Sequence, residues 1–366
     1  MRTCIFGSAL LPFLALQTSG QCAAASEWDQ LKVPSPKSYL CYRSTSPVII
    51  DGKLDDVSWA RAPWTDEFAD IEGAIKNNPR LRTRAKMLWD QRYFYIGAEL
   101  EEPQVSGTLT NHDSVVFRDN DFEVFIDPNG DNHEYYEIEI NALNTVWDLF
   151  LKRPYKDGGP AENAWEIPGL KTGVHVDGTL NDPRDADRGW SVELAIPWKV
   201  LGEFAHRPAP PRDGDQWRVN FSRVEWRYEI VAGKYEKPRG QKEDNWVWSP
   251  QGIIDMHRPE KWGYVQFTTA RPGRAKLQAD PAVPTRDLLM EIYYAEREFH
   301  SKQKSWSDSL EKLGLGDLGV RSPYAVRLKL TSDGFKATAT LRLPFGKTEH
   351  WHITQESRLW KDSISS

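Results

Sequence analysis

The feature that most constrains the fold is a two-residue alternation of apolar and polar side chains that recurs between Val48 and Phe267. The alternating runs are short and are separated by Asp-Gly, Pro-Asn-Gly, Gly-Gly and proline-rich turns. A period of two is typical of strands with one buried face, and helical patterns are few in this region. We therefore predict a mainly β fold, an antiparallel β-sandwich. Its predicted strands are residues 83–89, 93–100, 121–127, 135–141, 145–151, 190–197, 216–224 and 263–267.

The pattern changes near residue 270. Pro272, Pro281 and Pro284 mark a linker. Beyond it, apolar residues recur at helical spacing, and two strand-like runs follow at 324–330 and 335–343. We expect a sandwich domain over residues 26–270, a linker over 271–284, and a small α+β unit, a helix followed by a hairpin, over 285–366.

The first residues have the pattern of an export signal. Arg2 precedes an apolar run over residues 4–16, and the small residues Ala23 to Ala25 offer a cleavage site. We predict a signal peptide over residues 1–25 and a secreted or periplasmic protein. Gln21 precedes Cys22 where lipid attachment needs a small residue, which argues against a lipoprotein. No later apolar run is long enough for a transmembrane segment.

Charge and cysteine content give no sign of several common partners and cross-links. The formal net charge is −6 with both signs interspersed, so the sequence favours neither a nucleic acid nor a membrane surface as partner. If cleavage follows Ala25, only Cys41 remains, which excludes an internal disulfide and a cysteine metal cluster.

Each predicted strand divides into two rows of side chains that point to opposite faces. On three strands one row is apolar: Phe122, Val124 and Ile126; Tyr136, Ile138 and Ile140; and Trp217, Val219 and Phe221. The opposite rows are rich in polar groups: Asp121, Glu123, Phe125 and Asp127; Tyr135, Glu137, Glu139 and Asn141; and Arg218, Asn220 and Ser222. If these strands are neighbours, one face of the sheet can hydrogen-bond a polyhydroxylated ligand. The alternative is a solvated face with weak ion pairs.

The chain contains 16 tryptophans, and several lie among polar residues. They include Trp165, Trp226, Trp246 and Trp248. An indole face stacks on the C–H groups of a sugar ring while nearby acids and amides bind its hydroxyls. For any single tryptophan, packing in the core remains the alternative.

Five motifs, in their order and spacing, resemble those of the family 9 carbohydrate-binding modules over most of residues 45–268. They are Val48-Ile49-Ile50-Asp51-Gly52 with Trp59, Leu88-Trp89-Asp90 before Tyr93-Phe94-Tyr95-Ile96, Asp121-Phe122-Glu123-Val124-Phe125-Ile126-Asp127, Gly189-Trp190-Ser191-Val192-Glu193 with Ile196-Pro197-Trp198, and Pro259-Glu260-Lys261-Trp262-Gly263. The resemblance implies a β-sandwich that accompanies polysaccharide-degrading enzymes. It also implies a sugar held between two tryptophans, with a glutamate, an arginine and amides binding hydroxyls.

The family's binding residues carry over only in part. By position, the first tryptophan falls at Phe117, the glutamate at Glu123 and an amide at Asn141. The chain departs from the family's pattern at the arginine, where it has Glu139, and at the second tryptophan, which falls near Met256. With Arg218 from the polar rows and the tryptophans that flank Met256, the predicted ligand-binding residues are Phe117, Glu123, Glu139, Asn141, Arg218, Trp248 and Trp262.

The sequence also offers candidate ligands for structural calcium. Asp127, Asn129 and Asp131 recur at every second position, and the family resemblance is compatible with structural calcium. The EF-hand pattern is not met, and a tight hairpin turn uses the same residue types.

Two other chemistries stay open as alternatives. Glu137 and Glu139 share a face one pleat apart, which is compatible with a retaining glycosidase, although an acid row is common on sheets. Met256-His257 is the one pair suited to haem, which similar sandwiches hold in electron-transfer proteins, but the chain lacks a Cys-x-x-Cys-His attachment site.

We therefore expect an exported carbohydrate-binding protein without its own catalysis, which recognises an oligo- or polysaccharide during glycan breakdown, in some cases beside glycan-degrading enzymes. The alternatives are a structural or protein-interaction module of an exported assembly and a haem-binding electron-transfer sandwich.

Overall fold

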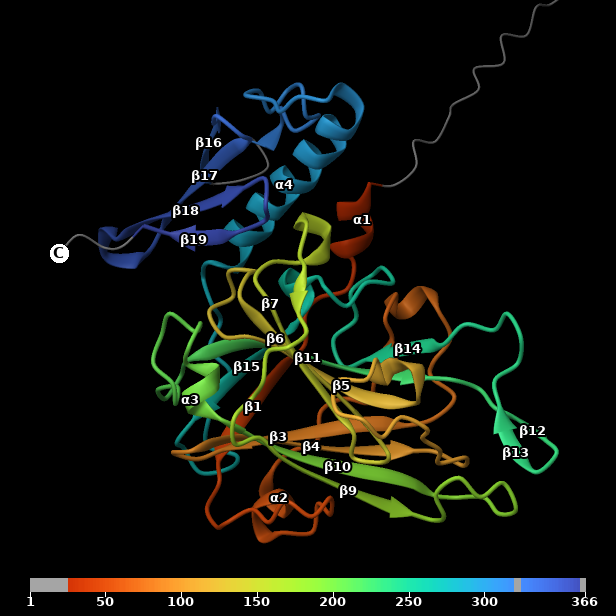
Figure 1. Ribbon diagram of the computed structural model, residues 1–366. Helices are drawn as coiled ribbons and strands as arrows, with labels where there is room; N and C mark the ends of the chain where they lie inside the picture. The colour runs from red at the N-terminus through yellow and green to blue at the C-terminus, as the bar shows by residue number, and fades with distance from the viewer. Residues whose placement is uncertain (1–25, 319–323, 363–366) are drawn as a thin grey trace, which may run out of the picture.

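The computed structural model describes residues 26–318 and 324–362 (Figure 1). The predicted signal peptide, residues 1–25, lies outside the described residues. Within the described ranges no helix has the length and apolar character needed to span a membrane.

A thirteen-stranded sheet forms the main body, as predicted for a mainly β chain. Its strands are β1 (Ser38–Arg43), β2 (Ala69–Asp70), β3 (Thr83–Trp89), β4 (Tyr93–Glu101), β5 (Asp121–Asp127), β6 (Tyr135–Asn141), β7 (Val146–Leu151), β8 (Ala161–Glu162), β9 (Lys171–Asp177), β10 (Gly189–Pro197), β11 (Gln216–Glu225), β14 (Asp244–Val247) and β15 (Gly263–Thr268). All eight predicted strands are present, each with ends within one residue of the prediction. The short strands β2, β8 and β14 and the longer β1 and β9 were not predicted, because their apolar runs are brief or interrupted.

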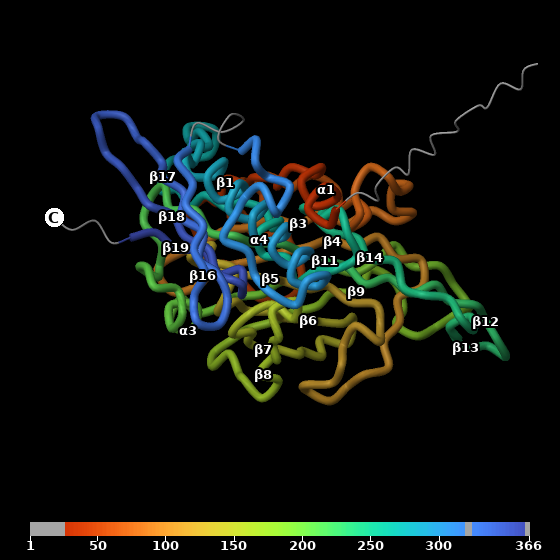
Figure 2. Tube along the Cα trace, turned by 90° about the horizontal axis from the view of Figure 1, so that it is seen from above, coloured from red at the N-terminus to blue at the C-terminus, as the bar shows by residue number. Residues whose placement is uncertain are grey.

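The strand order is β8-β7-β6-β5-β11-β15-β1-β3-β4-β10-β9, with β14 pairing β11 and β2. Strand β1 joins the two halves of this sheet and runs parallel to both of its neighbours, β15 and β3. The other pairings in the sheet are antiparallel. The sheet curls so that its two halves pack face to face (Figures 1 and 2). This gives the predicted sandwich, except that the two halves are connected through the parallel pairings of β1.

The main core lies between the two halves of the sheet. The predicted apolar rows of β5, β6 and β11 are all in it, and residues such as Phe122, Ile138 and Phe221 are completely buried. They meet Ile96 of β4 and Leu194 of β10 from the other half. Burial of apolar surface contributes about 25 cal/mol per Å², so these alternating rows specify which face of each strand turns inward.

The remaining elements are short or belong to the C-terminal unit. The helices and 3₁₀ turns outside that unit are α1 (Glu27–Leu31), α2 (Val57–Arg61), α3 (Trp198–Leu201), η1 (Gly73–Ile75), η2 (Val116–Arg118), η3 (Tyr155–Asp157) and η4 (Pro259–Lys261). A separate hairpin consists of β12 (Glu229–Val231) and β13 (Lys234–Glu236). It projects from the side of the sandwich (Figure 1).

The C-terminal unit has the predicted helix and hairpin, and its sheet has four strands. Helix α4 (Val283–Gln303) covers a sheet of β16 (Ala325–Leu330), β17 (Phe335–Arg342), β18 (Thr348–Thr354) and β19 (Leu359–Lys361), with η5 (Pro344–Gly346) between β17 and β18. The helix begins at Val283, inside the predicted linker over residues 271–284.

A buried polar network connects α4 to the sandwich. Lys156 Nζ lies 2.9 Å from Glu260 Oε1, and the same carboxylate accepts a hydrogen bond from the Tyr294 hydroxyl of α4. Trp28 of α1, near the N-terminal end of the described residues, stacks on the same Tyr294 with ring centroids 5.6 Å apart. The helix is therefore held by charged, hydrogen-bonded and aromatic contacts at one position.

Candidate functional site

The outer face of β5, β6, β7 and β11 brings the predicted polar rows together. Glu123 of β5 lies opposite Glu139 of β6, and Ser222 of β11 lies opposite Glu123. Trp147 of β7 lies opposite Glu139. The strands β7, β6, β5 and β11 are neighbours in the sheet, so their polar rows share one face, as the sequence analysis required.

Four carboxyl groups on this face form what we call the acidic cluster: Asp121, Glu123, Glu137 and Glu139. One carboxylate oxygen from each of Asp121, Glu123 and Glu139 lies within 4.8 Å of those of the other two. All four residues are at most 5% exposed. In the part of the chain that the structure describes, Asp121 Oδ2 is buried without a hydrogen-bond partner.

Burial raises the pKa of all four carboxyls, and repulsion from neighbouring carboxylates adds to the shift of Asp121, Glu137 and Glu139. Burial raises the pKa of Glu123 to about 7. It also raises the pKa of Asp121, Glu137 and Glu139 well above the ordinary values, and the charge of Glu123 adds to each of these shifts. At neutral pH some of the four groups therefore keep their protons, since like charges at this spacing disfavour full ionisation. A mixed set of carboxyls and carboxylates both donates and accepts hydrogen bonds.

Aromatic rings lie beside the acidic cluster. Phe117, in η2, is 39% exposed, and its ring centroid lies 6.4 Å from that of Trp147. Glu139 Oε2 accepts a hydrogen bond from the Phe117 amide (3.0 Å), and the Trp226 indole N–H donates to the Phe117 carbonyl (2.9 Å). These two bonds fix the backbone of an exposed ring next to the carboxyls.

A histidine and a tyrosine lie on the other side of the acidic cluster. The His257 ring packs edge-on against Tyr155 at 4.4 Å, and its Nδ1 lies 2.9 Å from the Tyr135 hydroxyl. Its Nε2 is 4.0 Å from Glu137 Oε2. Burial lowers the pKa of His257 to about 4, so the imidazole is neutral and does not neutralise the carboxyls. Tyr155 is 49% exposed and adds a second accessible ring.

Asn141 lies at the end of this face with all its hydrogen-bonding groups engaged. Its Nδ2 donates to the Leu109 carbonyl (2.9 Å) and to Asp119 Oδ2 (3.1 Å). Its Oδ1 accepts from the amides of Leu143 and Thr145. The Asn141 side chain orders the turn after β6, whereas the sequence predicted that it contacts a sugar.

Three other predicted binding residues are placed away from the acidic cluster. The Arg218 guanidinium donates to the carbonyls of Pro259 and Glu260 and stacks on Tyr264 at 4.0 Å. Trp248 is 1% exposed and lies in the main core. Trp262 is fully buried in a second apolar cluster that covers part of the outer face. Both tryptophans are therefore packed in apolar cores, as the alternative to sugar stacking held, and neither ring face is accessible to a ligand.

The comparison with known families covers the strands that carry the acidic cluster. Residues 50–208 match the model of the family described as carbohydrate family 9 binding domain-like. Residues 50–208 form a family 9 binding-like domain. The match includes β5, β6 and β7, while β11, β15 and the C-terminal unit lie beyond it.

Relatives of this family 9 domain occur within much larger enzymes. The chain is 26% identical over 153 residues to exoglucanase XynX of Acetivibrio thermocellus and 25% identical over 153 residues to endo-1,4-beta-xylanase A of Thermoanaerobacterium saccharolyticum. These alignments cover 42% of this chain and 12% and 11% of the relatives. The chain thus spans about a tenth of the length of these two relatives.

Solved structures of the family are also similar to the chain. A family 9 module from Caldicellulosiruptor kristjanssonii in complex with cellotriose aligns at a TM-score of 0.43 and 16% identity, covering 67% of this chain and all of the module. A structure of such a module from the same organism with glucose aligns at 0.42 and 17% identity, covering 63% of this chain and 96% of the module.

The candidate calcium ligands form a hairpin turn of the family 9 domain. Asp127 accepts hydrogen bonds from the amides of Gly130 (2.8 Å) and Asn132 (3.0 Å). Asn129 Oδ1 accepts from the Asp131 amide at 3.2 Å. Burial raises the pKa of Asp127 to about 7. The side-chain oxygens thus serve the turn, which agrees with the hairpin alternative, and a calcium role for Asp127, Asn129 and Asp131 stays a prediction.

The pair considered for haem is engaged in packing. Met256 is 9% exposed, and its sulfur lies 3.2 Å from Gln251 Nε2. The adjacent His257 contacts Tyr135 and Tyr155, as described above. The two side chains therefore have separate protein partners.

Sequence reasoning missed Trp147, Tyr155 and His257 as neighbours of the acidic cluster. Trp147 had a usable signal, because it alternates with Leu149 and Leu151 on a predicted strand. Tyr155 and His257 lie in a 3₁₀ turn and a loop, where no periodicity indicates which way a side chain points.

Proposed function

We propose that this chain binds a saccharide at the acidic cluster and at the aromatic rings beside it, Phe117, Trp147 and Tyr155. The observation that carries the proposal is the adjacency of buried carboxyls, one with an unpartnered oxygen among the described residues, to the exposed ring of Phe117. The family 9 match over the same strands supports it. Relatives named as an exoglucanase and a xylanase point to plant-type polysaccharides as the first ligands to test.

The chemistry of the site matches the two kinds of surface on a sugar. Phe117, with Trp147 and Tyr155, offers rings for the C–H face, while partly protonated carboxyls exchange hydrogen bonds with hydroxyl groups.

The wider role that we propose is recognition of a polysaccharide by an exported, non-catalytic protein that works beside glycan-degrading enzymes. The N-terminal sequence pattern supports export. The family match supports binding rather than hydrolysis, because the matched family is described as a carbohydrate-binding domain.

The decisive experiment is calorimetric titration of the purified chain with glucose, cellotriose and xylo-oligosaccharides. We expect binding that Phe117→Ala weakens and that Phe345→Ala leaves unchanged. Phe345 is a matched control, because it is a fully exposed phenylalanine of the C-terminal unit. Equal affinities of both variants and the unmodified chain would reject this site.

Glycoside hydrolysis is the second candidate, and one observation favours it. Carboxyl oxygens lie within 4.8 Å of one another, and burial raises the pKa of Glu123 to about 7. Retaining glycosidases place two carboxyls at about this spacing and raise the pKa of one of them. Release of reducing sugar by the same preparation, lost in Glu123→Gln, would replace the binding proposal with this one.

A further inference from the structure

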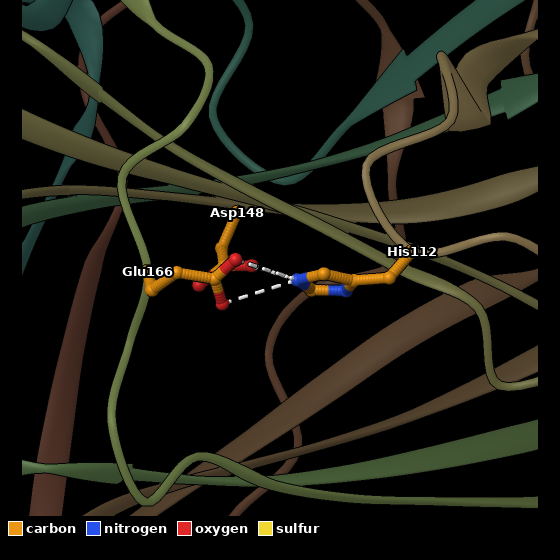
Figure 3. A group of neighbouring side chains, drawn as sticks. All are labelled: His112, Asp148 and Glu166. Carbon is orange, nitrogen blue, oxygen red and sulfur yellow. Dashed lines mark hydrogen bonds and ion pairs between the residues drawn. The ribbon is translucent and has the colours of Figure 1, made fainter.

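A second group of ligating side chains lies at the edge of the sandwich, away from the acidic cluster. It consists of His112, from the loop before η2, Asp148 of β7, and Glu166, from the loop after β8, and we call it the histidine triad (Figure 3). Asp148 neighbours Trp147 on its strand, so the two side chains point to opposite faces of the sheet. The histidine triad is therefore separate from the proposed saccharide site.

The three side chains converge on one point. His112 Nε2 lies 3.1 Å from Glu166 Oε2 and 3.5 Å from Asp148 Oδ1, and one ligand atom from each residue lies within 4.8 Å of the others. Zinc binds nitrogen and oxygen ligands tetrahedrally at about 2.0–2.2 Å, which separates the ligand atoms by roughly 3.3–3.5 Å. The distances to His112 Nε2 are close to the edges of such a tetrahedron. Asp113 Oδ1 also lies 3.4 Å from the same nitrogen.

Asp148 shows that this convergence is more than a surface ion pair. The residue is 1% exposed, and its Oδ2 accepts a hydrogen bond from the Ile167 amide at 2.6 Å. Its Oδ1, which faces the imidazole, has no hydrogen-bond partner within residues 26–318 and 324–362. Buried polar atoms nearly always have a hydrogen-bond partner or a bound ion, so a missing ligand explains this unpartnered oxygen. A second-shell bond such as that from Ile167 also fixes which oxygen of a metal-binding carboxylate is presented.

The alternative is a protonated imidazole held among carboxylates. Although partial burial lowers the pKa of His112, the hydrogen bond to Glu166 and the nearby acids outweigh it and raise the pKa. Burial raises the pKa of Asp148 to about 6. His112 and Glu166 are about half exposed, and an ion pair so exposed contributes only about 0–1 kcal/mol. Such a pair does not offset the cost of an unpaired, buried Asp148 oxygen.

We propose that His112, Asp148 and Glu166 bind a divalent transition-metal cation, with Zn²⁺ as the best fit. An imidazole nitrogen with two carboxylates matches zinc, whereas calcium and magnesium take oxygen ligands. The cation joins the loops that carry His112 and Glu166 to strand β7 at the edge of the sheet. Its role is structural, and it stabilises the loop that leads into η2 and Phe117.

The test uses the full chain without a polyhistidine tag, stripped with a chelator and dialysed. Calorimetric titration with Zn²⁺ gives affinity and stoichiometry, and Co²⁺ serves as the spectroscopic probe of tetrahedral geometry. We expect one equivalent of Zn²⁺ to bind, visible Co²⁺ absorption of the tetrahedral type, and a higher thermal midpoint in the presence of Zn²⁺.

Three variants connect the metal to the histidine triad. His112→Ala and Asp148→Asn should each weaken Zn²⁺ binding at least about ten-fold, since even outer-shell changes cost 10- to 100-fold. His206→Ala is the matched control, because His206 forms an exposed pair with Glu134 at 2.7 Å. It should bind Zn²⁺ like the unmodified chain.

The proposal is overturned by any of three results. These are the absence of stoichiometric Zn²⁺ binding, a binding constant unchanged by His112→Ala in a variant with native circular dichroism, and loss of binding in His206→Ala. Because the histidine triad and the acidic cluster lie on opposite faces, failure of saccharide binding leaves this test unaffected.

Discussion

Glu123 and Glu139 face each other across the paired strands β5 and β6, and both carboxyls are buried within one acidic cluster. Because burial raises the pKa of both carboxyls, the folded protein keeps a proton here that the unfolded chain releases, and a ligand that donates hydrogen bonds to the pair shifts this balance. The pair therefore connects stability, pH and binding, and each can be measured.

The first prediction concerns the exposed ring. Phe117→Ala should weaken saccharide binding by about 1 kcal/mol, roughly five-fold in the dissociation constant, because a stacking surface is lost. Calorimetric titration checks this, with Phe345→Ala measured in parallel. An unchanged dissociation constant in Phe117→Ala contradicts the prediction.

The second prediction concerns the pH dependence of stability. Burial raises the pKa of Glu123 from the ordinary 4.5 to about 7 in the folded protein. Between these values the unfolded chain has released this proton and the folded chain has kept it. Stability therefore falls as pH rises from about 4.5 to 7, by a total on the order of 3 kcal/mol. Glu123→Gln should flatten this decline.

Urea unfolding at pH 5 and pH 8 measures that difference. Glu229→Gln is the control, because Glu229 is exposed on the separate hairpin. If the drop in stability from pH 5 to pH 8 is the same in Glu123→Gln as in the control, Glu123 is not the group that titrates.

The third prediction separates core tryptophans from binding tryptophans. Trp248→Ala should lower the free energy of unfolding by about 3–5 kcal/mol, because it leaves a cavity between Tyr39 and Phe221. Ile254→Ala, at a side chain that is 67% exposed, should change it by less than about 0.5 kcal/mol. Thermal and urea unfolding give both values, and a Trp248 variant of unchanged stability would place this indole outside the core.

The fourth prediction concerns the buried Lys156–Glu260 pair of the sandwich, to which Tyr294 of helix α4 donates a hydrogen bond. Lys156→Met leaves the Glu260 carboxylate buried without its cation, and should cost about 3–5 kcal/mol. Lys302→Met removes an exposed pair with Glu298 and should cost at most about 1 kcal/mol. Adding Glu260→Gln to Lys156→Met should recover part of the loss. If Lys156→Met costs no more than Lys302→Met, the pair contributes little to docking of the helix.

The sequence predicted the strands well because alternation is a local property. Rows such as Phe122, Val124 and Ile126 indicate their own buried face, and the structure confirms that face. The grouping of Glu123 with Glu139 also followed, because strands joined by a short turn pair in a defined register.

The parts of the site that the sequence did not predict depend on tertiary structure. A polar neighbourhood in the sequence did not predict exposure for Trp248, since its strand neighbour Val247 faces one way and the indole the other. Arg218 shares the polar face but lies near the start of β11, where the carbonyls of Pro259 and Glu260 in η4 accept its hydrogen bonds. The histidine triad combines three segments, and no single motif contains it.

Strand β1 has a consequence for how the chain matures. It lies between β15 and β3, and Ser38 is aligned with Tyr264 near the far end of the sandwich sequence. The two halves of the sheet cannot close until that late strand has been synthesised. Until then an unpaired edge of β1 stays open, so aggregation in this interval should be the main hazard during production, and fragments that stop before residue 263 should be insoluble.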